Sequence, residues 1–372
     1  MKNGFNLGRI FGIPLRLHYT WFLIFVLMTF TLVAYLPIPE VYPLWQRIVA
    51  GVVASLLFFT SIVVHELAHS FVAVRNSIPV RSITLFVFGG VSQITKEASR
   101  PNIELLVAIV GPLASVMIAG IFHGAYLVLI DGGAFLAAML ARWLAFINGL
   151  MAIFNLIPGF PLDGGRVLRS IIWMVSGNYS RATRIATLTG RVIAYLFIVG
   201  GIVVAFVTHE WFTGLWLAFI GWFLENAAAS SYREVLQRDA LRNFTARDVM
   251  ITSNPFLSRR LTVEQLVLDC VLSAGRHTFI VAEEGRLEGM VTLHNIKSVP
   301  RERWGDTLVE EIMIPADKLK IAHPEQRALS LLDQMDEEDV NQIPVVEKGA
   351  VIGMVARSSL IHFLRTRAEL GI

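Results

Sequence analysis

Six apolar stretches constrain this chain more than any other feature of its sequence. They lie at residues 18–36, 48–74, 105–130, 135–154, 185–207 and 211–224, and the last is short. A helix needs about 20 apolar residues to cross the hydrocarbon core of a bilayer. With 55% hydrophobic residues over 372 positions, the chain is too apolar for an ordinary soluble protein. The sequence therefore predicts a polytopic α-helical membrane domain with six transmembrane helices.

Charge marks where this domain ends. Residues 1–228 hold 14 Lys and Arg against 8 Asp and Glu, whereas residues 229–372 hold 18 against 21. We therefore expect a membrane domain at 1–228, a linker at 229–243 and a soluble domain at 244–372. The basic excess of the first part follows from membrane topology, so it gives no indication of nucleic-acid binding.

The distribution of basic residues also predicts orientation. Eleven Lys and Arg fall before the first stretch or in the loops between the second and third and the fourth and fifth stretches, and Arg47 lies on the other side. Because Lys and Arg are enriched in cytoplasmic loops, both termini are predicted in the cytoplasm. The N-terminus lacks the pattern of a cleaved signal peptide, so the first helix is expected to remain. A chain with one cysteine and no sorting signal suits the cell membrane of a bacterium or archaeon.

The second stretch carries three ionisable residues in the order His65, Glu66, His69. Residues four apart share a helix face, so the two imidazoles can bind one metal ion while Glu66 lies beside them. Ionisable side chains inside a membrane are costly, about 2.5 to 3.5 kcal/mol each for charged ones, so the trio indicates function. The spacing is typical of zinc hydrolases, in which zinc activates a water and the glutamate takes its proton. A chance match on a buried helix is the alternative.

A third ligand is expected from the sequence NLIPGFPLDGGR, which follows the fourth stretch. Asp163 opens a new helical segment after a break, at a depth where it can meet His65 and His69. A broken helix is tolerated in a membrane where it lines a cavity or packs on protein. Asn155 is expected to stabilise the oxyanion of a tetrahedral intermediate, with capping of the fourth helix as the alternative.

The sequence PVRSITLFVFGGVSQIT, between the second and third stretches, alternates like a strand and then reaches a glycine pair. One interpretation is a cytoplasmic hairpin packed on the helices. The other is a strand edge that pairs with an extended substrate, with Phe88, Gly89 and Gly90 as substrate-binding residues. Both interpretations remain open.

These motifs together resemble the site-2 protease family of intramembrane zinc metalloproteases. HELAH fits its zinc motif, NLIPGFPLDGG its Asn, Pro and Asp-Gly element, and GPLAS, at 111–115, a Gly-Pro motif of its third helix. The resemblance implies one zinc ion per chain, bound by His65, His69 and Asp163, with Glu66 as general base and Asn155 as a polar residue of the active site. It also implies cleavage of membrane proteins in or near a transmembrane segment, as in regulated intramembrane proteolysis.

The soluble part contains one unit twice. RDVM at 247–250 matches EEIM at 310–313, and LEGMVTLHNI at 287–296 matches VIGMVARSSL at 351–360. Each copy predicts a small α/β unit, and the whole resembles a tandem CBS pair with copies at about 244–300 and 307–366. The family implies an adenine nucleotide as a possible ligand at Thr292 and Asn295. In the second copy the corresponding positions are Ala356 and Ser359, which lack the pattern.

The sequence thus predicts an intramembrane zinc endopeptidase modulated by a CBS pair, which also suggests a homodimer. A CBS-regulated transporter or channel is the alternative, because polar intramembrane residues can line an ion path. A catalytically inactive scaffold is a further alternative, which the intact His65, Glu66, His69 and Asp163 disfavour.

Overall fold

The computed structural model describes residues 4–35, 42–87, 89–94, 98–241, 243–252, 256–272, 278–338 and 340–370. The chain divides into two compact units, Met1–Leu236 and Gln237–Ile372. The prediction for Phe88 lies outside the described residues.

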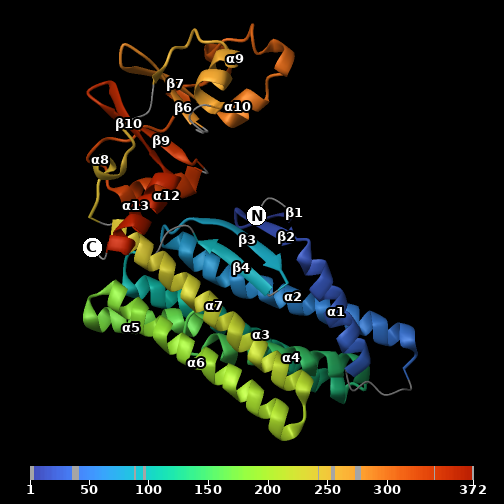
Figure 1. Cartoon of the computed structure of the whole chain (residues 1–372). Coiled ribbons are helices and arrows are strands. Elements are labelled where there is room, and N and C mark those ends of the chain that lie inside the picture. The colour runs from blue at the N-terminus through green and yellow to red at the C-terminus, as the bar shows by residue number, and fades with distance from the viewer. Residues whose placement is uncertain are drawn as a thin grey trace. The chain divides into compact units, whose positions relative to one another are not determined.

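The first unit is built from seven helices among its described residues (Figure 1). They are α1 (Thr20–Tyr35), α2 (Leu44–Arg75), α3 (Pro101–Asp131), α4 (Phe135–Asn155), α5 (Asp163–Ser176), α6 (Tyr179–Thr208) and α7 (Trp211–Leu241). Within the described part of the chain, four of them, namely α2, α3, α4 and α6, are long and apolar enough to cross a membrane. The protein is therefore an integral, multi-pass membrane protein.

The first and the last of the six predicted stretches are also helical, but neither is among these four long apolar helices. The first becomes α1, an apolar helix of 16 residues. The last becomes the beginning of α7, which continues through polar residues to Leu241. Helix α7 continues past 224 because Glu, Ala, Arg and Gln favour helix as strongly as leucine does.

Small residues allow the helices to approach closely, as is common in membrane bundles. Ala54 of α2, Ala108 of α3 and Ala138 of α4 have no exposed surface. Between α6 and α7, a Cβ on Gly201 would lie 2.5 Å from the Gly214 carbonyl oxygen. Glycine at these positions therefore sets the distance between α6 and α7.

A four-stranded sheet covers part of the helices. Its strands, in spatial order, are β1 (Gly4–Ile10), β2 (Ile13–His18), β3 (Val80–Phe86) and β4 (Gly89–Ile94). A hairpin at β3 and β4 was one of the two interpretations of this segment, and the two strands do pair antiparallel. The β1–β2 hairpin was not predicted, although in β2 the apolar Ile13, Leu15 and Leu17 alternate with other residues.

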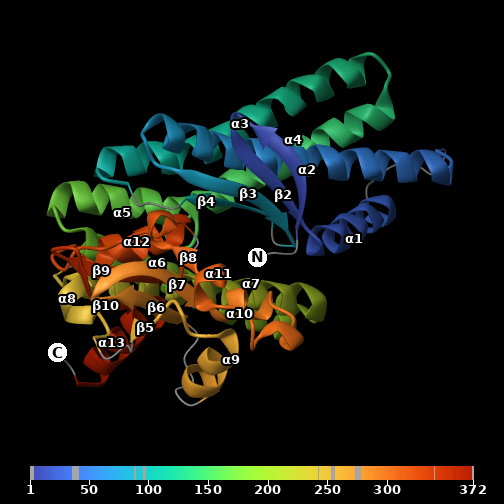
Figure 2. The same ribbon diagram turned by 90° about the horizontal axis from the view of Figure 1, so that it is seen from above.

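The sheet packs on α2 through a cluster of buried apolar side chains. Leu17 of β2 and Leu85 of β3 contact Phe59 and Ile62 of α2. Figure 2 shows β3 and β4 running along α2. Strand β4 lies at one edge of the sheet, and among the described residues no further strand pairs with it beside the helix that carries the histidine motif.

The second unit is an α/β domain around one sheet. The strand order is β5-β6-β7-β10-β9, and β8 pairs with β7. The strands are β5 (Phe256–Leu257), β6 (Thr278–Glu283), β7 (Arg286–Thr292), β8 (Ile314–Pro315), β9 (Gln342–Glu347) and β10 (Ala350–Ala356). The helices are α8 (Ala246–Val249), α9 (Val263–Leu266), α10 (Leu293–Lys297), α11 (Val309–Ile312), α12 (Ala328–Glu338) and α13 (Arg357–Leu370).

The internal repeat of the second unit appears in its turns. Glu284 and Gly285 join β6 to β7, and Lys348 and Gly349 join β9 to β10; all four have positive φ. Two consecutive residues with positive φ are typical of the tight turns that close antiparallel hairpins. The same hairpin therefore occurs 64 residues later, which agrees with the repeat read from the sequence.

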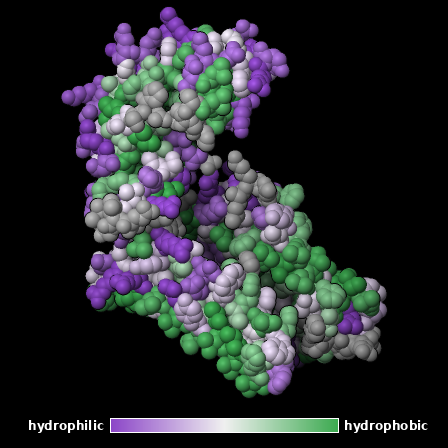
Figure 3. Space-filling view, viewed as in Figure 1, coloured by the Kyte–Doolittle hydropathy of each residue, from purple (hydrophilic) through white to green (hydrophobic). Residues whose placement is uncertain are grey.

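The surfaces of the two units differ in polarity. In Figure 3, apolar side chains cover the helices of the first unit, whereas hydrophilic side chains predominate on the second. Exposed apolar residues of the first unit include Phe30, Met117, Val128 and Phe206. An apolar surface of this extent fits contact with lipid, and the polar surface of the second unit fits contact with water.

Candidate metal centre

Helix α2 presents His65 and His69 on one face, toward α3 and α5. Their exposed fractions are 4% and 3%, although both are polar. Glu66, the next residue, is half-buried and lies beside β4. The helical spacing of the motif therefore places both imidazoles in the interior of the first unit, with a carboxylate next to them.

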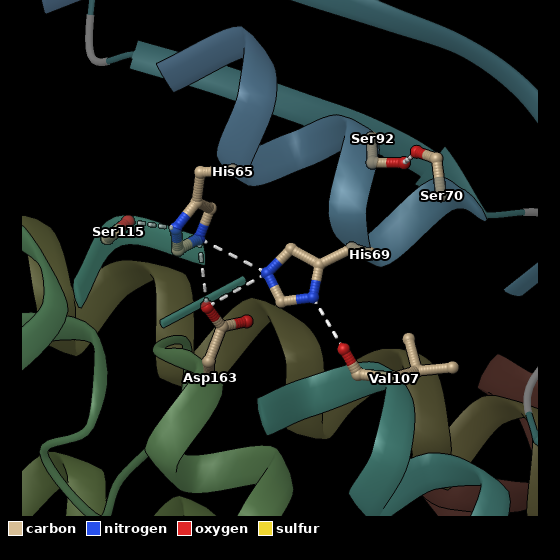
Figure 4. Close-up of polar contacts among 7 residues, drawn as sticks. All are labelled: His65, His69, Ser70, Ser92, Val107, Ser115 and Asp163. Atoms are coloured by element: carbon tan, nitrogen blue, oxygen red, sulfur yellow. Dashed lines mark hydrogen bonds and ion pairs between the residues drawn. The ribbon is translucent and has the colours of Figure 1, made fainter. Parts of the chain in front are cut away.

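Asp163, the first residue of α5, meets the two imidazoles (Figure 4). Its Oδ2 lies 3.2 Å from Nε2 of His65 and 3.1 Å from Nε2 of His69, and the two Nε2 atoms are 3.2 Å apart. Ligands bound tetrahedrally to zinc at about 2.0 to 2.1 Å lie about 3.3 Å from one another. The three atoms are therefore spaced as one zinc ion requires.

The other ring nitrogens of the histidines have partners on α3. Nδ1 of His69 donates to the carbonyl oxygen of Val107 at 2.6 Å, and Nδ1 of His65 lies 2.8 Å from Oγ of Ser115. A carbonyl oxygen only accepts, so the His69 proton is on Nδ1 and the lone pair is on Nε2. In the neutral imidazole this lone pair faces the Asp163 carboxylate, another acceptor. A cation between them removes the repulsion, so these lone-pair atoms fit a metal ion.

Gly111 allows α3 to approach the centre. A Cβ built at this position would collide with the imidazole ring of His69. The sequence motif 111–115 thus contains two residues in direct contact with the histidines, Gly111 and Ser115. From the sequence, the motif was identified only by its resemblance to the family, and neither residue was predicted to have a role.

Two glycines after Asp163 allow the chain to fold back before α5. A Cβ on Gly164 would collide with the carbonyl oxygens of Leu156 and Ile157, and a Cβ on Gly165 with the backbone of Gly159 and Phe160. Only glycine leaves room for such close backbone approach. This packing brings Asp163 to the depth of the histidines, as the break in the sequence predicted.

A cavity of about 480 Å³ opens beside His65 and Asp163. His65, Glu66, Asn155, Asp163, Gly89 and Gly90, all singled out from the sequence, line it. Most of the remaining wall is apolar, formed by Phe58, Ile62, Met151, Phe154, Pro161, Leu162, Trp216, Phe219, Ile220, Phe223 and Leu224. The residues from α7 were not predicted, because their apolar pattern reads equally well as a lipid-facing helix.

Gly90 brings β4 against Glu66. A Cβ on Gly90 would lie 2.8 Å from Cγ of Glu66 and 3.1 Å from Cγ2 of Ile62. One turn further along α2, Oγ of Ser70 lies 2.7 Å from Oγ of Ser92 on β4. The edge strand is therefore held along the face of α2 that carries Glu66.

Thr292 and Asn295 belong to the second unit and not to this cavity. Oγ1 of Thr292 donates to Oδ1 of Asn295 at 2.6 Å, and the Thr292 backbone N–H donates to the same oxygen at 3.0 Å. The pair forms a capping box at the start of α10. Ser359 makes the equivalent contact in the second copy, accepting from the Ala356 backbone N–H at 3.1 Å.

Comparison with known protein families identifies two regions of similarity. The model described as peptidase family M50 matches residues 53–139 and 132–199. The CBS domain model matches residues 309–366.

Two curated relatives extend the similarity over nearly the whole chain. A protein of Synechocystis sp. named as a zinc metalloprotease, sll0528, is 32% identical over 99% of this chain and 97% of its own length. Rip3 of Mycobacterium tuberculosis, also named as a zinc metalloprotease, is 32% identical over 98% of this chain and 93% of its own length. Among solved structures, the site-2 protease from Methanocaldococcus jannaschii is 28% identical, with a TM-score of 0.43, over 62% of this chain and 95% of that one.

Proposed function

This chain belongs to peptidase family M50, as a site-2 type intramembrane zinc metalloprotease with a CBS domain, and from that premise we propose that His65, His69 and Asp163 hold its zinc ion. One observation carries the assignment. Three donor atoms lie 3.1 to 3.2 Å apart, and the His69 tautomer, fixed by Val107, directs its Nε2 lone pair at the carboxylate of Asp163. Zinc, when bound there, supplies a Lewis acid that activates a water and polarises the scissile carbonyl.

Glu66 is the proposed general base. It lines the same cavity as His65 and Asp163 and is the carboxylate of the motif that is not assigned to the metal. A base next to the attacking water takes its proton and returns it to the leaving amine. The Asn155 amide, on the cavity wall, donates to the developing oxyanion. Among the described residues the Asn155 side chain has no hydrogen bond within the protein, so its amide is available for this role.

Substrates of this family are membrane proteins, and we propose that cleavage occurs in or near a transmembrane segment. The largely apolar, aromatic wall of the cavity suits such a segment once it has unwound. An unwound segment must satisfy its backbone hydrogen bonds inside the membrane. The edge of β4 offers those bonds by strand addition, with Gly90 next to Glu66 and Gly89 on the wall of the same cavity. The third residue expected there, Phe88, lies outside the described residues.

Six crossings with both termini in the cytoplasm are the proposed topology. Helices α1 and α7 would add two crossings to the four long apolar helices, and the positions of the basic residues support the orientation. We place the protease domain at 1–228, the linker at 229–243 and the regulatory domain at 244–372. The linker is largely the end of α7.

The regulatory domain is proposed to be a tandem CBS pair, with copies at about 244–300 and 307–366, that forms a homodimer and modulates the protease. An adenine nucleotide at Thr292 and Asn295 would have to displace the hydrogen bonds that now join them. Calorimetric titration with ATP, ADP and AMP tests this, using Thr292→Ala as the control. Absence of heat in the wild type would exclude nucleotide control.

The central experiment compares purified wild-type protein with Glu66→Gln. We expect both to contain about one zinc ion per chain, and only the wild type to cleave a transmembrane substrate. Removal of a general base typically costs about 10²- to 10⁴-fold in rate. Wild-type protein without zinc would overturn the ligand assignment, and equal cleavage by both proteins would overturn the role of Glu66.

A further inference from the structure

A buried ion pair joins α3 to α5 away from the metal-binding atoms. Glu104, in the first turn of α3, is 1% exposed. Nε of Arg169, in α5, donates to Oε1 of Glu104 at 2.6 Å, and Nη2 of Arg169 contacts the same oxygen. We propose that this pair, the Glu104–Arg169 clasp, positions Asp163 for metal binding.

The Arg169 side chain also contacts the segments on both sides of α5. Its guanidinium carbon lies 4.8 Å from the ring centroid of Phe160, three residues before Asp163, and 4.8 Å from that of Tyr179, which begins α6. The next residue, Ser170, donates from Oγ to the carbonyl oxygen of Pro101 at 2.7 Å. Arg169 thus connects the start of α3, the turn before Asp163 and the start of α6.

The clasp joins α5 to α3, the helix whose residues also orient the two histidines. Helix α3 contributes Val107 and Ser115, which bind the imidazoles, and Glu104, which binds α5. Arg169 lies six residues after Asp163, which is about 9 Å along the helix. Holding α5 to α3 at this distance fixes where the Asp163 carboxylate lies relative to the two imidazoles.

Stability alone does not explain the clasp. A buried ion pair is often no more stabilising than well-packed apolar side chains of similar volume. Oε2 of Glu104 has no hydrogen-bond partner among the described residues, so the burial of this carboxylate is incompletely compensated. What an arginine provides here, and an apolar side chain does not, is a planar group that can hold a carboxylate and stack on two rings at once.

The inference rests on the proposed role of Asp163 as a ligand, and it makes Glu104 and Arg169 positioning residues that touch neither metal nor substrate. A double-mutant cycle on the full-length protein tests it, with the zinc Kd measured by competition with a chelator. The variants are the clasp variant Glu104→Met with Arg169→Met, Asp163→Ala, and all three substitutions together. The paired methionines avoid leaving one charge buried and unpaired.

We expect the clasp variant to fold and to bind zinc about 10-fold or more weakly, as is usual when groups that orient a ligand are lost. In the Asp163→Ala background the same two substitutions should weaken binding no further, because the clasp acts through that carboxylate. Arg184→Met, at an exposed position of α6, is the matched control and should keep the zinc Kd within about twofold.

Two results would overturn the inference. One is a wild-type zinc Kd in the clasp variant, and the other is equal weakening with and without Asp163, which indicates a general structural effect. If the clasp variant does not fold, Arg169→Lys keeps the charge but loses the planar group, and the same cycle applies. An unchanged zinc Kd in Asp163→Ala would instead refute the ligand assignment itself, so the two failures are distinguishable.

Discussion

The hydrogen bond from Nδ1 of His69 to the Val107 carbonyl decides which nitrogen of that ring faces Asp163. A backbone carbonyl is a rigid partner, because it cannot rotate away or donate. The corresponding partner of His65 is the Ser115 hydroxyl, which can either donate or accept. The two histidines are therefore oriented by different means, and α3 provides both partners.

Gly111 is the residue through which the orientation of His69 can be tested. Gly111→Ala adds a Cβ that collides with the His69 ring, so the ring must move and lose its hydrogen bond to Val107. We expect the zinc Kd to rise by about 10-fold or more, measured by chelator competition. Gly120→Ala on the same helix, where a Cβ meets nothing within 4 Å, is the control and should bind zinc normally. Equal affinities in the two variants would contradict the prediction.

At the scale of elements, β4 is held between β3 and helix α2. The hydroxyl pair of Ser70 and Ser92 joins it to α2, and the missing side chain of Gly90 leaves room for Glu66. The strand thus combines a backbone edge of the sheet with a fixed distance to the proposed base. This combination is what cleavage of an extended peptide requires.

Gly90→Ala tests this arrangement. The added Cβ would lie 2.8 Å from Cγ of Glu66, so either the strand or the carboxylate must shift. Because a misplacement of about 1 Å can cost about 100-fold in rate, we expect a large loss of cleavage with normal zinc content. Val91→Ala is the control, because adjacent strand residues point to opposite faces and Val91 is exposed. Normal cleavage by Gly90→Ala would contradict the prediction.

The close contact between α6 and α7 should make the stability of the protein sensitive to a larger residue at Gly201. Gly201→Ala places a Cβ 2.5 Å from the Gly214 carbonyl oxygen and 2.6 Å from the Ala218 nitrogen. Overpacking of this kind costs about 1 to 3 kcal/mol, so Tm should fall by roughly 3 to 10 °C. Gly200→Ala is the matched control, since a Cβ there meets only Leu217 at 4.0 Å. A Tm equal to that of the control would show that the helices can separate without cost.

At the scale of the whole molecule, one cysteine provides a probe of orientation. Cys270 is the single cysteine of the chain, and it lies half-buried in the second unit. Burial raises the pKa of its thiol, with the nearby Asp269 adding to the effect. Because the thiolate is the nucleophile, labelling by a maleimide should become faster as the pH rises toward that pKa.

The proposed topology predicts that a membrane-impermeant maleimide labels Cys270 in inside-out vesicles and not in intact cells. The control is Cys270→Ser combined with Asp131→Cys, at the exposed end of α3, which should show the opposite pattern. Labelling of Cys270 in intact cells would place the second unit outside and contradict the orientation.

Much of the site could be predicted because its chemistry lies in short segments. The spacing of His65, Glu66 and His69 follows from the helical period, and the break before Asp163 follows from proline and glycine. The alternation and the glycine pair of the β3–β4 hairpin are equally local. For the same reason the two repeats in the second unit could be recognised by comparing the chain with itself.

Other features depend on contacts between distant segments. Val107 and Ser115 bind histidines 38 and 50 residues away in the chain, and Glu104 meets Arg169 across 65 residues. The aromatic residues of α7 line the cavity, although their pattern is the same as that of a helix facing lipid. Hydropathy also does not show where a helix that begins apolar ends, since α7 continues from its apolar start through polar residues to Leu241.

The sequence by itself determined the membrane class, the metal-binding chemistry and the repeated second unit, because residue type and spacing act locally. Only the tertiary structure decided the His69 tautomer, the edge strand beside Glu66 and the clasp that holds α5. These depend on how closely the helices approach one another. That distance is set by packing at Gly111, Gly164 and Gly165. No local sequence pattern shows which atoms of another segment pack against a glycine.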